Sequence, residues 1–474
     1  MRRLLTIVTA IAAGTLTVQP VGVASAAPTP DDASYAVSLT TGPRARGWTG
    51  TESVTFTNTG TDALTEVWLR LWANGPGGCR EPGIEVSNVT GGSAGEPSVR
   101  CTALPVAFDA PLAPGATTSL SMDIRIRVPR SNDRFGRVQG ISMLGNALPL
   151  LAVNDDDGWN LERYTGIGES FYSLVSDFDV TLRVPPEVDT ATTGTRDTSA
   201  PTPTPPPGGV ETRAYVATDV RDFMWVAGTL RRRSDTDAIG TRVNVWYPPR
   251  FFDREVAMRA LGEAIRSMDA FSGAFGEYPY DEVDVVFAGF TEFGGMEYPQ
   301  LVLTVPNEYV LAHELAHQWW YGIVGDDQFD EPWVDESFAQ WSMMYPYFPW
   351  DECEMYAWPS DAARLSNPMS YWIDHPRQYW IPYWQGACML QTLVDVFGLA
   401  RFLEILHHYA ADHWLGIATT ADVQAAFEAA AIEDGLTWDA DAFWDEWRVG
   451  PDDGVGRLVP GRGSPPTLRD LVEG

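Results

Sequence analysis

The sequence contains no lysine, and its basic side chains are far outnumbered by its acidic ones. Arginine supplies all 32 basic residues, against 64 aspartates and glutamates, so the formal net charge is -32. A protein that binds nucleic acid needs basic side chains to neutralise phosphates. The composition therefore argues against nucleic acid as a partner. Solubility is the simplest reason for the acidity, and steering of cationic substrates is the alternative.

Long apolar runs are missing except near the start of the chain. Residues 1–26 combine two arginines, an apolar run and the small residues Ala24, Ser25 and Ala26 in an A-x-A pattern, which predicts a cleaved signal peptide. A membrane anchor is the alternative, but it needs about 20 apolar residues, and Gly14 and Gln19 interrupt this run. We therefore expect a secreted, extracellular protein without stable membrane insertion.

Cysteine is scarce, and no two cysteines have C-x-x-C spacing, so a thiolate zinc site is not predicted. An even number of cysteines in an exported chain favours two disulfides. Three pairings are possible. If each bridge stays inside one domain, Cys79 pairs with Cys101 and Cys353 with Cys388. The second bridge would then tie the helix after Tyr383 to the region that follows Glu336.

Two patterns divide the chain into two domains. Short runs of alternating apolar and polar residues, such as 119–128 and 179–184, predict antiparallel strands in a sandwich-like domain over 27–234. The proline-rich stretch 186–210 resembles a linker, but strand-like runs resume after it, so we place it in a loop of this first domain. The alternation gives way to a different pattern near residue 234.

Apolar residues at three and four spacing predict a mainly helical second domain over 235–452. A strand-like pair at 281–289 and 301–305 adds a small sheet, so the fold class is α+β. The tail 453–474 is rich in Gly and Pro and is predicted to be flexible. The predicted helices cover 254–276, 309–322, 336–345, 386–398, 401–414 and 421–431.

Two of the six histidines stand four residues apart in VLAHELAHQWW, residues 310–320. On a helix, His313 and His317 share a face and can present two nitrogens to one ion, while Glu314 can reach a water on that ion. This is H-E-x-x-H, the zinc peptidase arrangement. Glu336, with 18 residues between it and His317, is a candidate third ligand on a second helix. Three protein ligands leave one zinc position open, as in catalytic sites.

The sequence resembles the aminopeptidase N family of gluzincin zinc metallopeptidases. Three segments carry the resemblance: His313 to His317 with Glu336, FGGMEYP at 293–299, similar to the family's G-x-M-E-N loop, and IPYWQGACML at 381–390, similar to its Y-x-K-G segment. The likeness runs weakly back through the first domain. It implies a thermolysin-like catalytic domain that holds one Zn²⁺ per chain.

The resemblance also implies a role for each site residue. His313, His317 and Glu336 hold the zinc, and Glu314 is the general base. Tyr383 donates its hydroxyl to the oxyanion, a contact worth on the order of 3 kcal/mol. The substrate is held by the loop residues, in which Glu297 binds the α-ammonium group and the others lie along the peptide: Gly294, Gly295 and Met296.

The chain departs from the family pattern at several positions. Tyr298 replaces the asparagine of the loop, Asp335 and Ser337 replace the residues that flank the third ligand, and Gln385 replaces a lysine. These changes concern specificity and rate and leave the ligands intact. Glu169 is a weak candidate for the second amine contact that a first-domain residue supplies in many relatives. The large C-terminal helical domain of typical members is absent, so we expect a more open cleft.

We therefore predict a secreted zinc-dependent aminopeptidase that removes N-terminal residues from peptides. One alternative is a gluzincin endopeptidase with an open cleft. The other is a zinc-binding protein without catalytic activity. The aspartates before Gly158, residues 155–157, lack the full calcium-loop signature, so we interpret them as a turn.

Overall fold

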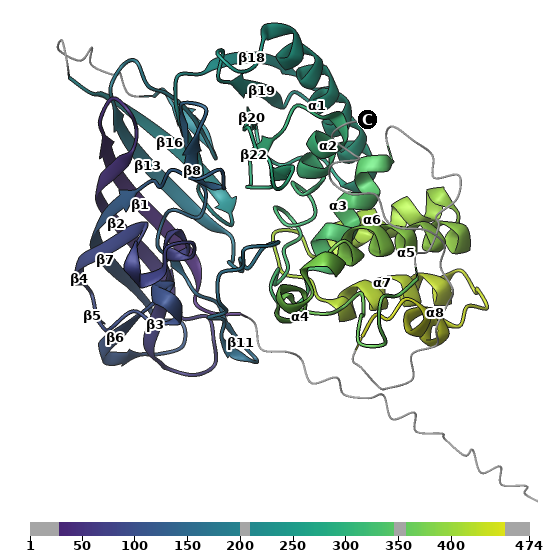
Figure 1. Ribbon diagram of the computed structural model, residues 1–474. Helices are drawn as coiled ribbons and strands as arrows, with labels where there is room; N and C mark the ends of the chain where they lie inside the picture. The colour runs from purple at the N-terminus through teal and green to yellow at the C-terminus, as the bar shows by residue number, and fades with distance from the viewer. Residues whose placement is uncertain (1–27, 200–208, 346–356, 451–474) are drawn as a thin grey trace, which may run out of the picture.

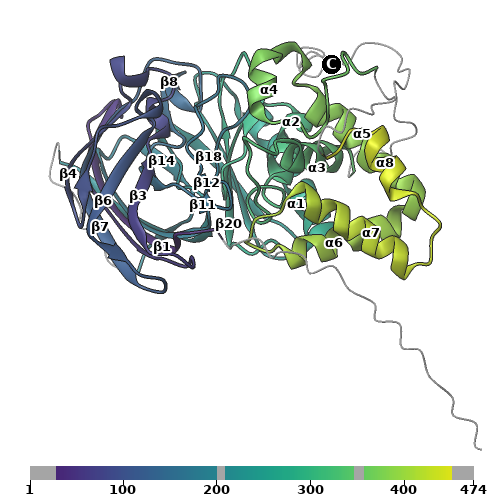
Figure 2. The ribbon, with the colours of Figure 1, turned by 90° about the horizontal axis from the view of Figure 1, so that it is seen from below.

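The computed structural model describes residues 28–199, 209–345 and 357–450. Purple and blue strands form one half of the molecule, and green to yellow helices form the other (Figures 1 and 2). This arrangement confirms the α+β fold class. The predicted signal peptide, the tail 453–474 and Cys353 lie outside the described residues, as do prolines of the tract at 200–208.

A large sheet and a smaller one enclose the core of the first domain. Strand order is β15-β16-β13-β1-β2-β7-β4 in the large sheet and β10-β3-β6-β5 in the small one. The large sheet contains β1 (Asp31–Thr41), β2 (Gly47–Thr57), β4 (Ile84–Thr90), β7 (Thr117–Arg127), β13 (Ser176–Val184), β15 (Thr195–Asp197) and β16 (Glu211–Val220). The small sheet contains β3 (Leu64–Arg70), β5 (Ser93–Ala94), β6 (Ala103–Leu112) and β10 (Leu150–Leu151).

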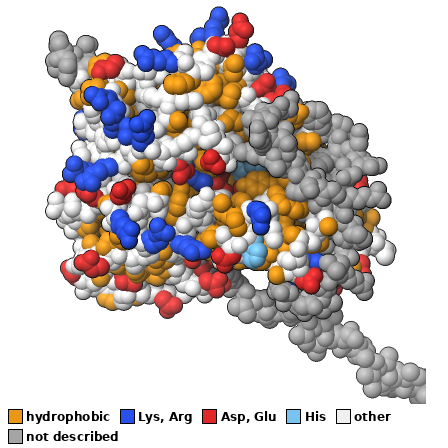
Figure 3. All heavy atoms as spheres, viewed as in Figure 1, with side chains coloured by type: hydrophobic (Ala, Val, Ile, Leu, Met, Phe, Trp, Pro, Cys, Tyr) orange, Lys and Arg blue, Asp and Glu red, His pale blue; other side chains and the backbone are white. Residues whose placement is uncertain are grey.

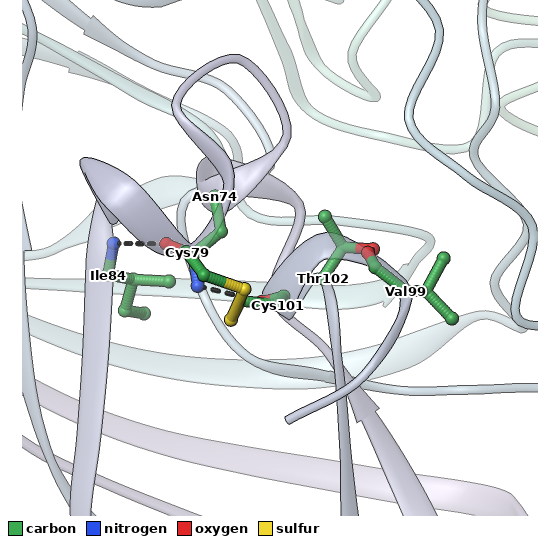
Figure 4. The surroundings of a disulfide bond; sticks show 6 residues. All are labelled: Asn74, Cys79, Ile84, Val99, Cys101 and Thr102. Atoms are coloured by element: carbon green, nitrogen blue, oxygen red, sulfur yellow. Dashed lines mark hydrogen bonds between the residues drawn. A yellow bond between two sulfur atoms is a disulfide. The ribbon is translucent and has the colours of Figure 1, made fainter. Parts of the chain in front are cut away.

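Buried and exposed residues alternate along the strands, and this alternation explains why the two sheets pack face to face. In β7 every second residue from Leu120 to Ile126 is buried, and these side chains join those of β3 and β6 in one apolar core. Strands β15 and β16, on either side of the proline tract, pair antiparallel, so the tract connects neighbouring strands of one sheet. The predicted bridge between Cys79 and Cys101 is present, beside Asn74, which accepts from the Ile84 amide (Figure 4).

A third sheet of the first domain faces the second domain. It contains β8 (Phe135–Val138), β9 (Ile141–Leu144), β14 (Asp189–Thr192) and β17 (Trp225–Gly228), and the hairpin β11 (Asn154–Asp155) and β12 (Gly158–Trp159) lies apart from it. Met143 and Val226 from this sheet share an apolar cluster with Met296 and Leu303 of the second domain. The two domains therefore meet through a continuous buried core.

The second domain begins with a sheet of order β18-β19-β20-β22-β21, comprising β18 (Arg231–Thr236), β19 (Arg242–Tyr247), β20 (Glu282–Phe287), β21 (Gly295–Met296) and β22 (Leu301–Thr304). Residue 234 falls inside β18, which pairs with β19 of this sheet. The sequence pattern overlooked β18 because nearly all of its side chains are exposed and show no alternation. The domain limits therefore remain predictions from sequence.

Helices form the rest of the second domain, and their bounds are α1 (Arg254–Phe275), α2 (Glu308–Ala316), α3 (Trp333–Met344), α4 (Met369–Asp374), α5 (Ile381–Phe397), α6 (Leu399–Asp412), α7 (Thr420–Glu433) and α8 (Ala440–Glu446). Short 3₁₀ turns are η1 (Trp72–Asn74), η2 (Gly78–Arg80), η3 (Val99–Cys101) and η4 (Pro376–Gln378). No helix in the described part of the chain combines the length and apolar character that crossing a membrane requires.

Candidate metal centre

Helix α2 begins at a capped end and carries the H-E-x-x-H residues. The side chain of Asn307 accepts from the amides of Tyr309 and Val310, which satisfies two of the free donors of the first turn. The helix ends at Ala316, and His317 is its C-cap. The predicted helix over 309–322 is therefore too long, because tight turns replace it after His317.

The three predicted ligands converge. His313 Nε2 lies 3.2 Å from Glu336 Oε2 and 3.1 Å from His317 Nε2, and His317 Nε2 lies 3.4 Å from Glu336 Oε2. Tetrahedral zinc with bonds of about 2.0–2.2 Å separates its ligand atoms by roughly 3.3–3.6 Å, so the spacing suits this ion. Among the described residues, this is the only cluster of His, Cys, Asp or Glu with such convergence.

A backbone carbonyl orients His317. Its Nδ1 lies 2.8 Å from the oxygen of Trp320, to which the ring donates. The proton on Nδ1 leaves Nε2 with a free lone pair toward the cluster, as in many metal-binding histidines. Burial alone would raise the pKa of Glu336, but hydrogen bonds with His313 and His317 outweigh it and lower this pKa. Glu336 is therefore held as an anion.

Glu314 lies against the edge strand β21. A Cβ placed on Gly295 would clash with the carboxyl group of Glu314, so glycine leaves room for this carboxyl group in its observed position. Burial and the charge of Glu297 raise the pKa of Glu314 well above its ordinary value. Such a shift suits a group that exchanges a proton near neutral pH. The structure thus shows a reason for Gly295 besides the close approach of substrate.

The other predicted residues of the 293–299 loop differ in their surroundings. Glu297 is buried, and its Oε1 accepts from Gln328 Nε2 at 3.0 Å. Met296 packs in the apolar cluster between the domains, and the Gly294 carbonyl accepts from the Val305 amide. Of these residues, Glu297 is the one whose carboxylate interacts electrostatically with Glu314 and His313.

Tyr383 lies in the first turn of α5 and reaches the cluster. Its hydroxyl donates to Glu336 Oε1 at 2.5 Å, and its ring stacks near that of His313 with centroids 5.8 Å apart. Burial and the charge of Glu336 raise the pKa of Tyr383, so its hydroxyl remains protonated at neutral pH. It can therefore act as a hydrogen-bond donor beside the ion site.

The residues that differ from the aminopeptidase N pattern make specific contacts in the structure. Ser337 donates to the Pro382 carbonyl and occupies the space over Gly386, which locks α3 against the start of α5. Asp335 accepts from Gln328, and Gln385 is fully buried. Tyr298 contacts the first domain, since its hydroxyl donates to Asn146 at 2.5 Å.

Sequence patterns did not identify several residues around the site. Gln328 donates to both Glu297 and Asp335, yet it lies in a loop without a recognisable motif. Arg134 forms a buried ion pair with Glu169 at 3.0 Å. Burial, followed by the charge of Glu297, raises the pKa of Glu169, so this carboxyl group interacts electrostatically with an acidic group of the site. The Trp320 carbonyl was missed because no sequence pattern reports a backbone acceptor.

Buried acidic groups greatly outnumber buried cations here. Glu297, Glu314, Asp335 and Glu336 are all at most 6% exposed, and the surface is hollowed where the domains meet, with acidic side chains along the hollow (Figure 3). Burying several carboxylates together is unfavourable unless cations compensate them. The site is therefore suited to a divalent ion and a cationic group of a ligand.

Known proteins provide a comparison for these observations. Residues 259–447 match the model of the peptidase family M1 domain. The chain is 29% identical over 205 residues to Aminopeptidase 2 of Candida albicans and 25% identical over 202 residues to Aminopeptidase N of Streptomyces lividans. These alignments cover 36% and 34% of this chain but only 22% and 23% of the relatives, so less than a quarter of each relative's length is matched.

A solved structure resembles both domains together. The M1 zinc metallopeptidase of Deinococcus radiodurans superimposes with a TM-score of 0.63 at 18% identity, covering 93% of this chain and 97% of that one. At this identity the likeness concerns the fold. A two-domain M1 zinc metallopeptidase variant bound to L-arginine superimposes with a TM-score of 0.62 at 18% identity, covering 92% of this chain and 96% of that one.

Proposed function

Because residues 259–447 match the model of the peptidase family M1 domain, we propose that this chain is a zinc-dependent aminopeptidase that removes N-terminal residues from peptides. One observation carries the proposal. Two imidazole nitrogens and a carboxylate oxygen converge within 3.1–3.4 Å of one another, beside the buried carboxyl group of Glu314. When bound, zinc would polarise the scissile carbonyl and acidify a water molecule.

The protein's own groups divide the remaining work. Glu314 accepts a proton from the attacking water and delivers it to the leaving amine, for which its raised pKa is suited. Tyr383, protonated at neutral pH, donates its hydroxyl to the oxygen that gains negative charge. The carboxylate of Glu297 accepts from the α-ammonium group of the substrate. Glu169, which pairs with Arg134, would provide a second contact to that amine.

A pair of peptides tests the exopeptidase assignment. We expect a panel of aminoacyl anilides to be hydrolysed, with activity lost on chelation and restored by zinc. We also expect a free peptide to be shortened from its N-terminus and its N-acetylated form to be ignored. Internal cleavage of both peptides would favour a gluzincin endopeptidase instead, and zinc binding without any hydrolysis would favour a catalytically silent protein.

Secretion is part of the proposal and rests on the sequence of residues 1–26. We expect the native host or a heterologous secreting host to release a chain that starts near residue 27. N-terminal sequencing of the protein from the culture medium measures this directly. Retention of the uncleaved chain in the cells would contradict it.

A further inference from the structure

Tyr321, four residues after His317, has an unusual backbone conformation. Its φ angle is 119°, in a region that bulky L-residues rarely adopt, and its side chain is buried. A conformation of this kind persists only where surrounding contacts hold it. The contacts of the adjoining peptide groups show what holds it and what it achieves.

The peptide between Trp320 and Tyr321 links the strained residue to the ion site. Its carbonyl, from Trp320, accepts from His317 Nδ1 at 2.8 Å, and its amide, from Tyr321, donates to the Val324 carbonyl at 2.7 Å. The next carbonyl, that of Tyr321, points to the first domain and accepts from Arg221 Nε at 2.6 Å. The positive φ lets the two successive carbonyls serve these two different donors.

Arg221 enters this region from the first domain, in the connection between β16 and β17. It is 2% exposed, and its guanidinium group also donates to the carbonyls of Ile323 at 3.3 Å and Gly416 at 2.5 Å. A fourth bond, at 3.0 Å, goes to Ser173. A Cβ on Gly325 would clash with the guanidinium carbon, so glycine leaves room for this close approach.

We propose that Arg221 is a positioning residue for the ion site. By binding the Tyr321 and Ile323 carbonyls, it keeps Tyr321 at positive φ and thereby keeps the Trp320 carbonyl on His317 Nδ1. The first domain would thus set the orientation of a ligand in the second domain. This inference rests on the proposed zinc site, and it concerns the affinity and geometry of that site.

A double-mutant comparison tests the proposal. Arg221→Met removes every hydrogen bond of the guanidinium group, whereas Arg221→Lys keeps the positive charge. If Arg221→Met does not fold, Arg221→Lys is used in its place. Tyr321→Gly removes the strain, because glycine adopts positive φ readily. Each variant is made alone and combined, and zinc affinity is measured by competition with a coloured chelator. The spectrum of the Co²⁺-substituted protein reports ligand geometry independently of activity.

We expect the Arg221 variants to bind zinc on the order of 10-fold more weakly and to alter the Co²⁺ spectrum, as the loss of outer contacts to metal-binding histidines does. In the Tyr321→Gly background, the same Arg221 substitutions should weaken zinc binding by less than about 3-fold. Arg70→Met is a matched control, because Arg70 is also buried and donates to two backbone carbonyls, those of Asn160 and Glu162. It should leave zinc affinity and the Co²⁺ spectrum unchanged.

The outcomes separate this inference from the proposed function. If the wild-type protein binds no zinc, the proposed function fails. If the wild type binds zinc and the Arg221 variants bind it equally well, the positioning role is wrong. Equal losses in the wild-type background and in the Tyr321→Gly background would also overturn it, because the strain would then have no part in the effect.

Discussion

Buried carboxyl groups occur in both domains, but their surroundings differ. In the second domain, Glu336 contacts two histidines and a tyrosine, and Glu297 accepts from Gln328. In the first domain, Glu52 on β2 is 1% exposed, and neither of its oxygens contacts a donor among the described residues. Buried carboxyl groups thus stay ionised where hydrogen-bond donors surround them. Glu52 has no such donors in the described part of the chain, so burial raises its pKa and favours its neutral form.

Burial alone therefore does not identify a functional carboxylate. Burial raises the pKa of Glu314 and of Glu52 alike, yet only Glu314 adjoins a convergent ligand set and a glycine that leaves it room.

Glu314→Gln should have the largest effect. The amide cannot accept the proton of the attacking water, so we expect turnover to fall by about 10²–10⁴-fold while zinc content stays the same. Anilide hydrolysis and elemental analysis measure the two quantities. Glu308→Gln, on the same helix, is the control and should retain activity. Normal turnover by Glu314→Gln would show that another group is the base.

Tyr383→Phe should reduce kcat by about 10²–10³-fold with little change in KM, because the hydroxyl acts on charge that develops in the transition state. Steady-state kinetics with one aminoacyl anilide separate the two constants. The hydroxyl also donates to Glu336, so zinc affinity is measured in parallel. A rise in KM alone would assign Tyr383 to substrate binding.

Gln328→Met should raise KM by about 10-fold and change kcat little, because Glu297 loses the donor that orients it and the amine is held less well. Gln340→Met is the matched control. Gln340 is also buried, but its Nε2 has no hydrogen-bond partner among the described residues. Equal kinetic effects of the two variants would rule out a specific role for Gln328.

Glu52→Gln should affect stability and leave activity unchanged. The folded-state pKa of Glu52 lies above the ordinary value of 4.5, so the folded protein binds the extra proton and loses stability as pH rises above about 4.5. We expect the free energy of unfolding of the variant to exceed that of the wild type by about 1–3 kcal/mol at pH 8. At pH 4 the two values should differ little. Denaturant titrations at both pH values measure this, and a variant that is less stable at pH 8 would contradict it.

The sequence predicted the site best where its chemistry depends on side chains at helical spacing. The spacing of His313, His317 and Glu336 predicted that they would share one ion site, and the three side chains converge in the structure. The resemblance to the aminopeptidase N family is confirmed by the match of residues 259–447. The roles of the individual site residues remain predictions that the variants above address.

Contacts that depend on the backbone or on distant segments could not be predicted. Helix α2 ends at Ala316, and Tyr321, a few residues later, has a positive φ that this residue type does not signal in a sequence. Arg221 is 100 residues from Tyr321 in sequence, so only the folded chain brings them together. Strand β18 lacked a periodic pattern because it is an exposed edge strand.

The zinc content of the purified protein, after reconstitution and removal of loosely bound metal, shows whether His313, His317 and Glu336 form a metal site. We expect one zinc per wild-type chain by elemental analysis, and a clear loss of zinc in the His317→Ala variant. Absence of bound zinc from the folded wild-type protein under every reconstitution condition would contradict the account.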